Sequence, residues 1–158
     1  MIPRVKQAPH AFEDLAPGMA FRSGPRRITR ADIADFARLS GDHTRLHSDD
    51  AYAASTPFGG VVAHGALNLA VATGLAYASG LFEGTVLAVR SMTIDFERPV
   101  FPGDALTLCL QVRELDPRPR ADRGRVTFEV EVENQDGKRV LTGAWTLLLR
   151  RRPASTTG

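Results

Sequence analysis

The residues from Pro57 to Phe82 include no Asp, Glu, Lys or Arg, and this uncharged run sets the strongest limit on the structure of the chain. The run is long enough to cross a membrane. His64, Asn68 and Thr73 interrupt it, however, and its apolar residues are largely Ala and Val, which favour membrane insertion less than Leu, Ile and Phe do. A helix that is apolar on nearly all sides and does not face lipid must be surrounded by protein. We therefore expect a buried central helix from about His64 to Ser79, and no membrane span.

Downstream of this helix the hydrophobic period changes to two residues, which predicts a block of strands. Three segments alternate apolar and polar side chains, and a fourth follows Asp136-Gly137, a pair typical of hairpin turns. Prolines and glycines separate the segments, with Pro117 and Pro119 between the second and the third. The pattern predicts half-buried antiparallel strands at Met92–Phe96, Leu106–Val112, Val126–Val132 and Val140–Leu149. Cys109 lies on the second of these strands, where we expect a small filler without cysteine chemistry.

Upstream of the uncharged run, Thr29 followed three residues later by Asp32 resembles a capping box. This predicts a helix from about Arg30 to Leu39, preceded by a first strand from Phe21 to Ile28. The order of strand, short helix, loop, long helix and four strands is typical of an α+β fold in which an antiparallel sheet curls around one helix. A curled five-stranded sheet leaves edges, which commonly pair with another subunit. We therefore expect a homodimer with the two sheets joined edge to edge.

Composition and charge limit the function classes. A chain of 158 residues can bury a core without disulfides, and 20 Lys and Arg against 18 Asp and Glu give a net charge of +2, which is too small to indicate nucleic-acid binding. The single cysteine, and the lack of a signal-like apolar segment between Met1 and Gly18, favour a cytoplasmic protein. We expect one domain over residues 1–150 and a disordered basic tail over residues 151–158. Nucleic-acid binding by the tail arginines Arg150, Arg151 and Arg152 is the less favoured alternative.

Polar groups that can carry chemistry gather between Ser40 and Gly65, where neither hydrophobic period dominates. Asp42 and His47 are separated by four residues in a segment that Ser40-Gly41 opens and that we interpret as a loop. A carboxylate beside an imidazole pairs a mainly ionised group with one that exchanges a proton near neutral pH. The alternative, which the spacing alone favours, is that Asp42 caps a turn and His47 is a polar loop residue.

The segment Phe58–Gly65 adds context, because it leads directly into the predicted buried helix. A helix N-terminus holds unpaired N–H groups and a partial positive charge, so the amide of Gly65 is a candidate to bind a developing oxyanion. The alternatives are that Gly65 only packs against a strand and that His64 satisfies a nearby backbone group. For His64 we expect that structural role.

Three motifs together resemble the MaoC-like family of (R)-specific enoyl-CoA hydratases. They are the run Ser40–Asp49 with Tyr52-Ala53, the pair of segments Phe58–Gly60 and Ala63–Gly65, and the connection Phe96–Asp104. The resemblance covers about residues 15–149. It implies a hotdog fold, in which the sheet wraps the long helix. It also implies that Asp42 and His47 are the catalytic pair and that the amide of Gly65 binds the thioester carbonyl.

Two positions depart from the family pattern, which has Asn-Pro where this chain has Thr44 and Arg45. The Thr44 hydroxyl is a partial substitute for the amide, and Arg45 brings a charge suited to a carboxylate or phosphate on the substrate. We select four candidate substrate-binding residues, which are Thr44, Arg45, His64 and Thr73. No metal is implied and no cofactor is expected beyond the coenzyme A or acyl carrier protein that forms part of the substrate.

The function that this resemblance implies is hydration of a 2-enoyl thioester, or dehydration of a 3-hydroxyacyl thioester by the reverse path. Asp42 and His47 would deprotonate water and return a proton on the same face, while the Gly65 N–H stabilises the enolate. Two alternatives remain: a non-catalytic hotdog subunit that binds acyl chains or a catalytic partner, and a hotdog thioesterase.

Overall fold

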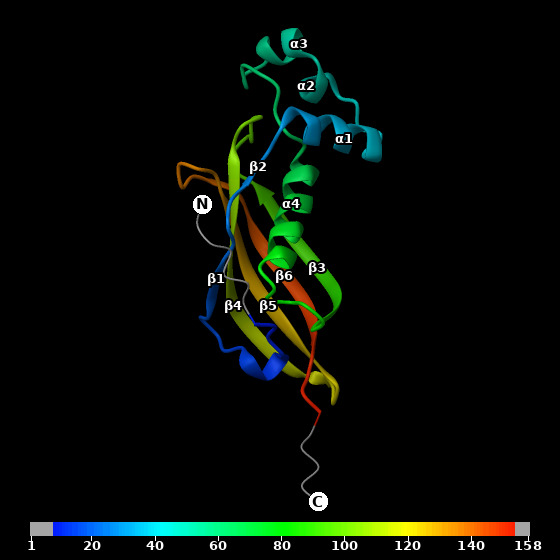
Figure 1. The fold of residues 1–158 in the computed structure, drawn as a ribbon, viewed down its shortest axis with the longest axis vertical. Coiled ribbons are helices and arrows are strands. Elements are labelled where there is room, and N and C mark those ends of the chain that lie inside the picture. Colours follow the sequence, from blue (N-terminus) through cyan, green and yellow to red (C-terminus); the bar gives the residue numbers. More distant parts are fainter. Residues whose placement is uncertain (1–7, 154–158) are drawn as a thin grey trace, which may run out of the picture.

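The structure is a computed structural model that describes residues 8–153. In chain order its elements are a 3-10 turn η1 (Phe12–Asp14), β1 (Ala20–Arg22), β2 (Arg26–Arg27), α1 (Arg30–Ser40), α2 (Arg45–Ser48), α3 (Asp50–Ala54), α4 (Gly65–Ala78), β3 (Val86–Phe96), β4 (Ala105–Arg120), β5 (Arg123–Glu133) and β6 (Arg139–Arg150). Figure 1 shows α4 lying along one face of a curved sheet, with α1, α2 and α3 gathered at one end of the molecule.

The sheet is antiparallel throughout, in the order β1-β4-β5-β6-β3, with β2 also paired to β4. Alternate residues of β4 and β5 form its buried face, as the period of two predicts. These buried residues are Leu106, Leu108, Leu110, Val112, Val126, Phe128, Val130 and Val132. The prediction of an α+β fold with an antiparallel sheet curled around one helix is therefore confirmed (Figure 1).

The central helix α4 begins and ends within one residue of its predicted bounds. Leu67, Val71, Ala72 and Leu75 are buried on the side that faces the sheet. The opposite side is not covered: Ala66, Ala70 and Thr73 are exposed, and the Tyr77 side chain is 73% exposed. The expectation of a helix surrounded by protein is thus wrong for a single chain, because one sheet can cover only one side of a helix.

Two strand boundaries differ from the sequence prediction. The first strand is split into β1 and β2 around Gly24-Pro25, because proline has no N–H to donate to β4. In contrast, β4 continues past Pro117 to Arg120. The pairing of β4 with β5 shifts register between Asp116 and Arg120, and such an irregularity accommodates residues that cannot donate to the ladder.

The first residues of the predicted basic tail contact η1, and the expectation of a disordered tail over residues 151–158 stays a prediction. The Arg151 N–H donates to the Asp122 carbonyl, and its guanidinium donates to Glu13 at 2.8 Å. Arg152 bonds both Glu13 and Asp14. These acidic partners in η1 were not anticipated, because they lie at the opposite end of the sequence. Residues 154–158 lie outside the described part of the chain.

Helix α1 positions the segment that carries the candidate site. The Thr29 hydroxyl accepts the Asp32 N–H at 3.1 Å and the Asp32 carboxylate accepts the Thr29 N–H at 2.8 Å, which confirms the capping box. Arg26 binds the same carboxylate through two N–H groups and, together with the Thr29 bonds, holds the pKa of Asp32 well below its usual range. At the other end Gly41 adopts φ +78°, a left-handed conformation that ends the helix. The chain therefore turns sharply just before Asp42.

The Asp136-Gly137 hairpin is also confirmed, with Gly137 at φ +70° and its N–H bonded to the Asn134 carbonyl. Cys109 lies on β4 and its sulfur accepts a hydrogen bond from Arg22, while burial raises the pKa of the thiol. Within residues 8–153, none of the helices has the length and apolar character that a bilayer crossing requires.

Candidate active site

Asp42 follows the end of α1 and is exposed, with its carboxylate held by Thr44. The Oδ1 atom accepts the Thr44 hydroxyl at 2.6 Å and the Thr44 N–H at 3.1 Å. The hydroxyl bond, then the N–H bond, and also the nearby imidazoles of His64 and His47, lower the pKa of Asp42 below its ordinary value. Asp42 therefore closes a local turn, as the structural alternative proposed, and it is also a carboxylate that stays ionised at neutral pH.

His47 does not lie in a loop, because residues Arg45–Ser48 form the short helix α2. Its Nδ1 atom is 2.7 Å from the carbonyl oxygen of Val62, which precedes α4. A carbonyl can only accept, so Nδ1 carries the proton and the neutral ring keeps a lone pair on Nε2. The Val62 segment is itself fixed, since the next amide, that of Ala63, donates to the buried Val100 at 2.8 Å. The backbone thus orients His47 with Nε2 available as a base.

Gly65 is the first residue of α4, so its N–H has no acceptor within the helix. A side chain here would press against the ring of Phe96 on β3, because a Cβ atom would lie 3.0 Å from its Cε1 and Cζ atoms. Gly65 therefore packs closely against a strand, and it also presents an unpaired amide at the positive end of a helix. The packing of Gly65 against a strand is thus confirmed, and the role of its amide in binding an oxyanion stays a prediction. Phe96, which was predicted to end a half-buried strand, is 56% exposed.

His64 is 2% exposed and precedes α4. Its Nε2 atom is 3.0 Å from the carbonyl oxygen of Asp42, and its ring stacks on that of His47 with centroids 3.8 Å apart. The expected role of satisfying a backbone group is confirmed. Burial and these contacts give no support to His64 as a residue that touches substrate.

The structure brings Asp42, His47 and His64 together, with one side-chain ligand atom from each lying within 4.8 Å of the others. A divalent cation is held by residues of these types at comparable separations. The two imidazole planes are only 28° apart, however, so the in-plane lone pairs run side by side instead of converging on one point. We therefore keep acid–base chemistry without a metal as the prediction for this cluster.

The other substrate-binding candidates lie apart from this cluster or are already engaged. The Arg45 guanidinium donates to Asp49 at 2.8 and 3.1 Å and lies 4.5 Å from the Tyr52 ring centroid, which favours its structural alternative. Thr73 is exposed, lies roughly 12 Å along α4 from Gly65 at 1.5 Å per residue, and donates its hydroxyl to the Ala70 carbonyl. Of Thr44, Arg45 and Thr73, Thr44 is the one that hydrogen-bonds to the Asp42 carboxylate.

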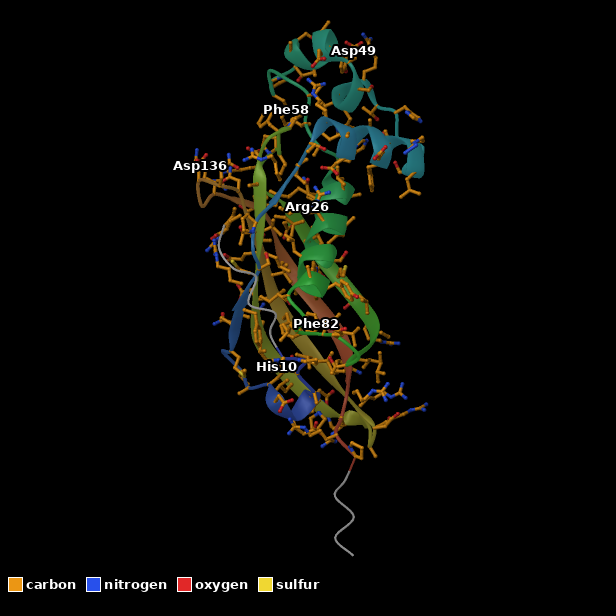
Figure 2. All side chains as sticks on the ribbon, viewed as in Figure 1. His10, Arg26, Asp49, Phe58, Phe82 and Asp136 are labelled. Carbon is orange, nitrogen blue, oxygen red and sulfur yellow. The ribbon has the colours of Figure 1, made fainter. Side chains whose placement is uncertain are left out.

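Three groups that contact the candidate site residues could not be identified from the sequence. They are the Val62 carbonyl, the Phe96 ring and the Asp49 carboxylate. A backbone carbonyl has no sequence signal, and Phe96 was identified as a strand residue and as the start of a family motif, without a contact to Gly65. The spacing of Arg45 and Asp49 at i and i+4 would have predicted their ion pair if a helix had been expected there. Figure 2 labels Asp49 and Phe58, which both lie at the end of the molecule where α1, α2 and α3 gather.

Comparison with known proteins adds independent findings. The family model of the MaoC like domain matches residues 13–135. The (R)-specific enoyl-CoA hydratase of Aeromonas caviae is 33% identical over 118 residues, which cover 75% of this chain and 84% of that protein. Protein MaoC of Klebsiella aerogenes is 39% identical over 100 residues, and the match spans 63% of this chain but only 29% of that longer protein.

Solved structures agree with the fold. The monoamine oxidase regulatory protein from Archaeoglobus fulgius superposes with a TM-score of 0.84 at 34% identity, covering 94% of this chain and 99% of that one. A Mycobacterium tuberculosis protein with a double hotdog fold gives a TM-score of 0.80 at 24% identity, covering 95% of this chain and 47% of that one, and so supports the fold alone. The hotdog architecture is confirmed.

Proposed function

The chain belongs to the MaoC-like domain family, and on that premise we propose that it hydrates 2-enoyl thioesters and, in reverse, dehydrates 3-hydroxyacyl thioesters. The single observation that carries the proposal is the meeting of the Asp42 carboxylate and the His47 imidazole at His64, the residue that directly precedes the first amide of α4. The activity in the printed name of the Aeromonas caviae relative supports the same reaction.

The proposed chemistry assigns one task to each group. The His47 Nε2 lone pair takes a proton from a water molecule that the Asp42 carboxylate orients, and the resulting hydroxide adds to the β-carbon. Electrons move through the double bond onto the thioester oxygen, where the Gly65 N–H stabilises the negative charge. His47 then returns its proton to the α-carbon on the same face and the enolate collapses. One water molecule is added in total, and dehydration follows the same steps in reverse.

The electrostatics of Asp42 favour this division of tasks. Because its pKa is lowered, mainly by the Thr44 hydroxyl, Asp42 remains an acceptor and His47 is the group that changes its protonation state. Both hydrogen bonds from Thr44 end on Oδ1 of Asp42. Among the described residues this leaves Oδ2 of Asp42 to accept a hydrogen bond from the water molecule.

We also propose that the chain works as a homodimer. Strand β3 is the last strand of the sheet, and Val86, Leu87, Val89 and Phe96 on it are at least 36% exposed. The uncovered side of α4 adds Tyr77 at 73% exposure. A long apolar edge strand favours aggregation unless it is paired or covered. A second copy of the chain, which carries the same edge, can cover it in a closed symmetric pair.

A paired assay tests the proposed reaction. Crotonyl-CoA and a short panel of enoyl and saturated acyl thioesters, on coenzyme A and on acyl carrier protein, are incubated with the full chain. Loss of the enoyl absorbance without release of free thiol is expected. Release of thiol from saturated thioesters would identify a thioesterase instead, and binding without either change would identify a non-catalytic acyl-binding subunit.

A further inference from the structure

His64 contacts both members of the proposed catalytic pair and directly precedes Gly65. Among residues 8–153 it is, with Asn68, one of the two buried polar side chains. Neither of its ring nitrogens is available to a substrate. Nε2 is bonded to the Asp42 carbonyl, and Nδ1 is fully enclosed without a hydrogen-bond partner in the described structure. Burial of an unpartnered nitrogen costs free energy, so an apolar side chain would be preferred here unless the imidazole served a purpose.

The first contact fixes the position of Asp42. Because a carbonyl only accepts, His64 donates its Nε2–H to the Asp42 carbonyl oxygen over 3.0 Å. The other hydrogen bonds of residues 41–44 within the described structure reach only neighbours in sequence, such as Ser40 and Ala37. The His64 bond is therefore the tie between this segment and the buried start of α4.

The second contact fixes the plane of the His47 ring. The two rings stack at 3.8 Å between centroids, and the ring of Phe36 packs near His64 with centroids 5.0 Å apart. The Val62 carbonyl sets the rotation of the His47 ring by its bond to Nδ1, while the His64 ring limits its tilt. Together these contacts determine where the His47 Nε2 lone pair points.

We propose that His64 is a positioning residue that sets the geometry of the Asp42–His47 pair through one hydrogen bond and one ring stack. This inference rests on the function proposed above. Both a flat ring and a donor at the Nε2 position are needed, and the imidazole of His64 supplies the two in one five-membered ring. A displacement of about 1 Å in a reacting group reduces rates roughly 100-fold, so the tie is expected to matter for turnover. KM should change little, because His64 does not touch the substrate.

Three variants separate the two contacts. His64→Gln keeps an N–H donor near the Nε2 position but loses the ring, His64→Phe keeps the ring but loses the donor, and His64→Ala loses both. We expect kcat for crotonyl-CoA hydration to fall about 100-fold in His64→Ala and about 10-fold in each of the other two, with KM within threefold of wild type. His10→Ala, at the opposite end of the molecule from α2 (Figure 2), is the matched control and should keep wild-type kcat.

A double-mutant cycle tests whether His64 acts by positioning His47 or contributes to catalysis independently of it. In a His47→Ala background, His64→Ala should lower the remaining activity by less than about threefold, because the geometry of the pair no longer matters. The pH profile of His64→Gln should keep both limbs of the wild-type profile. A full additional 100-fold loss in the cycle, a lost limb, or a change confined to KM would each overturn the proposal.

Amide hydrogen exchange supplies a readout that needs no activity. Exchange of residues 41–44 should accelerate in His64→Ala and His64→Phe but not in His64→Gln, with melting temperatures recorded for every variant. Unchanged exchange in all three folded variants would overturn the tie to Asp42. If wild type hydrates no thioester, the proposed function fails, whereas the exchange result still decides whether His64 holds this segment.

Discussion

The Thr44 hydroxyl is the strongest single influence on the ionisation of Asp42, through a 2.6 Å hydrogen bond. Thr44→Val keeps the shape and the N–H bond but removes the hydroxyl donor. The pKa of Asp42 should therefore rise towards that of a free carboxyl group. A titration of the Asp42 carboxyl carbon by NMR, in wild type and in Thr44→Val, measures this. A carboxyl pKa that is unchanged or lower in the variant would contradict the assignment of the shift to the Thr44 hydroxyl.

The Arg45 guanidinium forms an ion pair with Asp49 and lies over the ring of Tyr52. We therefore expect Arg45→Ala to change KM equally for crotonyl-CoA and for a thioester with a terminal carboxylate. Steady-state kinetics on the two substrates decide the matter, with Arg38→Ala as the control for loss of an exposed, paired arginine. A selective increase in KM for the carboxylated substrate, by a factor equivalent to about 1–2 kcal/mol, would instead support the recognition role suggested by the sequence.

The sequence identifies which residues belong to the candidate site better than it predicts how their side chains contact one another. Asp42, His47 and Gly65 could be selected because the motifs around them resemble those of the MaoC-like family, whereas the spacing of Asp42 and His47 alone favours a structural role. The bond from His47 to the Val62 carbonyl could not be predicted, because it depends on how the segment before α4 folds back on α2. Thr73 lies within the uncharged run, and its place roughly 12 Å along α4 from Gly65 follows only from the rise of the helix.

Helix α1 depends on its N-terminal cap for its position and hence for the start of the site segment. Asp32→Ala removes the bonds to Thr29 and to Arg26, and we expect about 1–2 kcal/mol less stability at pH 7. The folded-state pKa of Asp32 is lowered, so its contribution is complete above the unfolded pKa near 4 and is lost as pH falls below that value.

Urea unfolding at pH 7 and at pH 3 measures this difference. The gap between wild type and Asp32→Ala should shrink at the lower pH. Asp35→Ala is the matched control, because Asp35 and Arg38 are both about 70% exposed and their pair should contribute little at either pH. A gap that stays constant with pH would mean that the carboxylate charge does not stabilise α1.

Elements with a strong local signal could be predicted from the sequence, and those that depend on their neighbours could not. The Thr29 cap and the uncharged run located α1 and α4 to within one residue. The short helices α2 and α3 lack a hydrophobic period because they are too brief to show one. Pro117 was interpreted as a strand end, yet a bulge in the pairing with β5 absorbs it.

For the whole molecule, the uncovered side of α4 and the free edge of β3 predict a dimer. Light scattering at micromolar concentration should give twice the mass of one 17.1 kDa chain. Val89→Lys places a charge on an exposed position of β3 and should shift the equilibrium to monomer.

Leu39→Lys is the control for this change, because Leu39 is 84% exposed but lies on α1, away from β3. It should leave the dimer intact. A wild-type monomer at micromolar concentration would refute the dimer. A Val89→Lys dimer as stable as wild type would show that this edge is not the interface.

The turnover number of Asp42→Asn for crotonyl-CoA hydration, compared with wild type, shows whether the Asp42 carboxylate takes part in the proton transfers. The substitution keeps the shape of the side chain and removes its charge, and Asp42 is exposed, so the melting temperature should be unchanged. We expect a loss in kcat of at least about 100-fold, with a comparable loss in His47→Ala. If both folded variants keep more than about a tenth of the wild-type kcat, Asp42 and His47 do not carry the proton transfers.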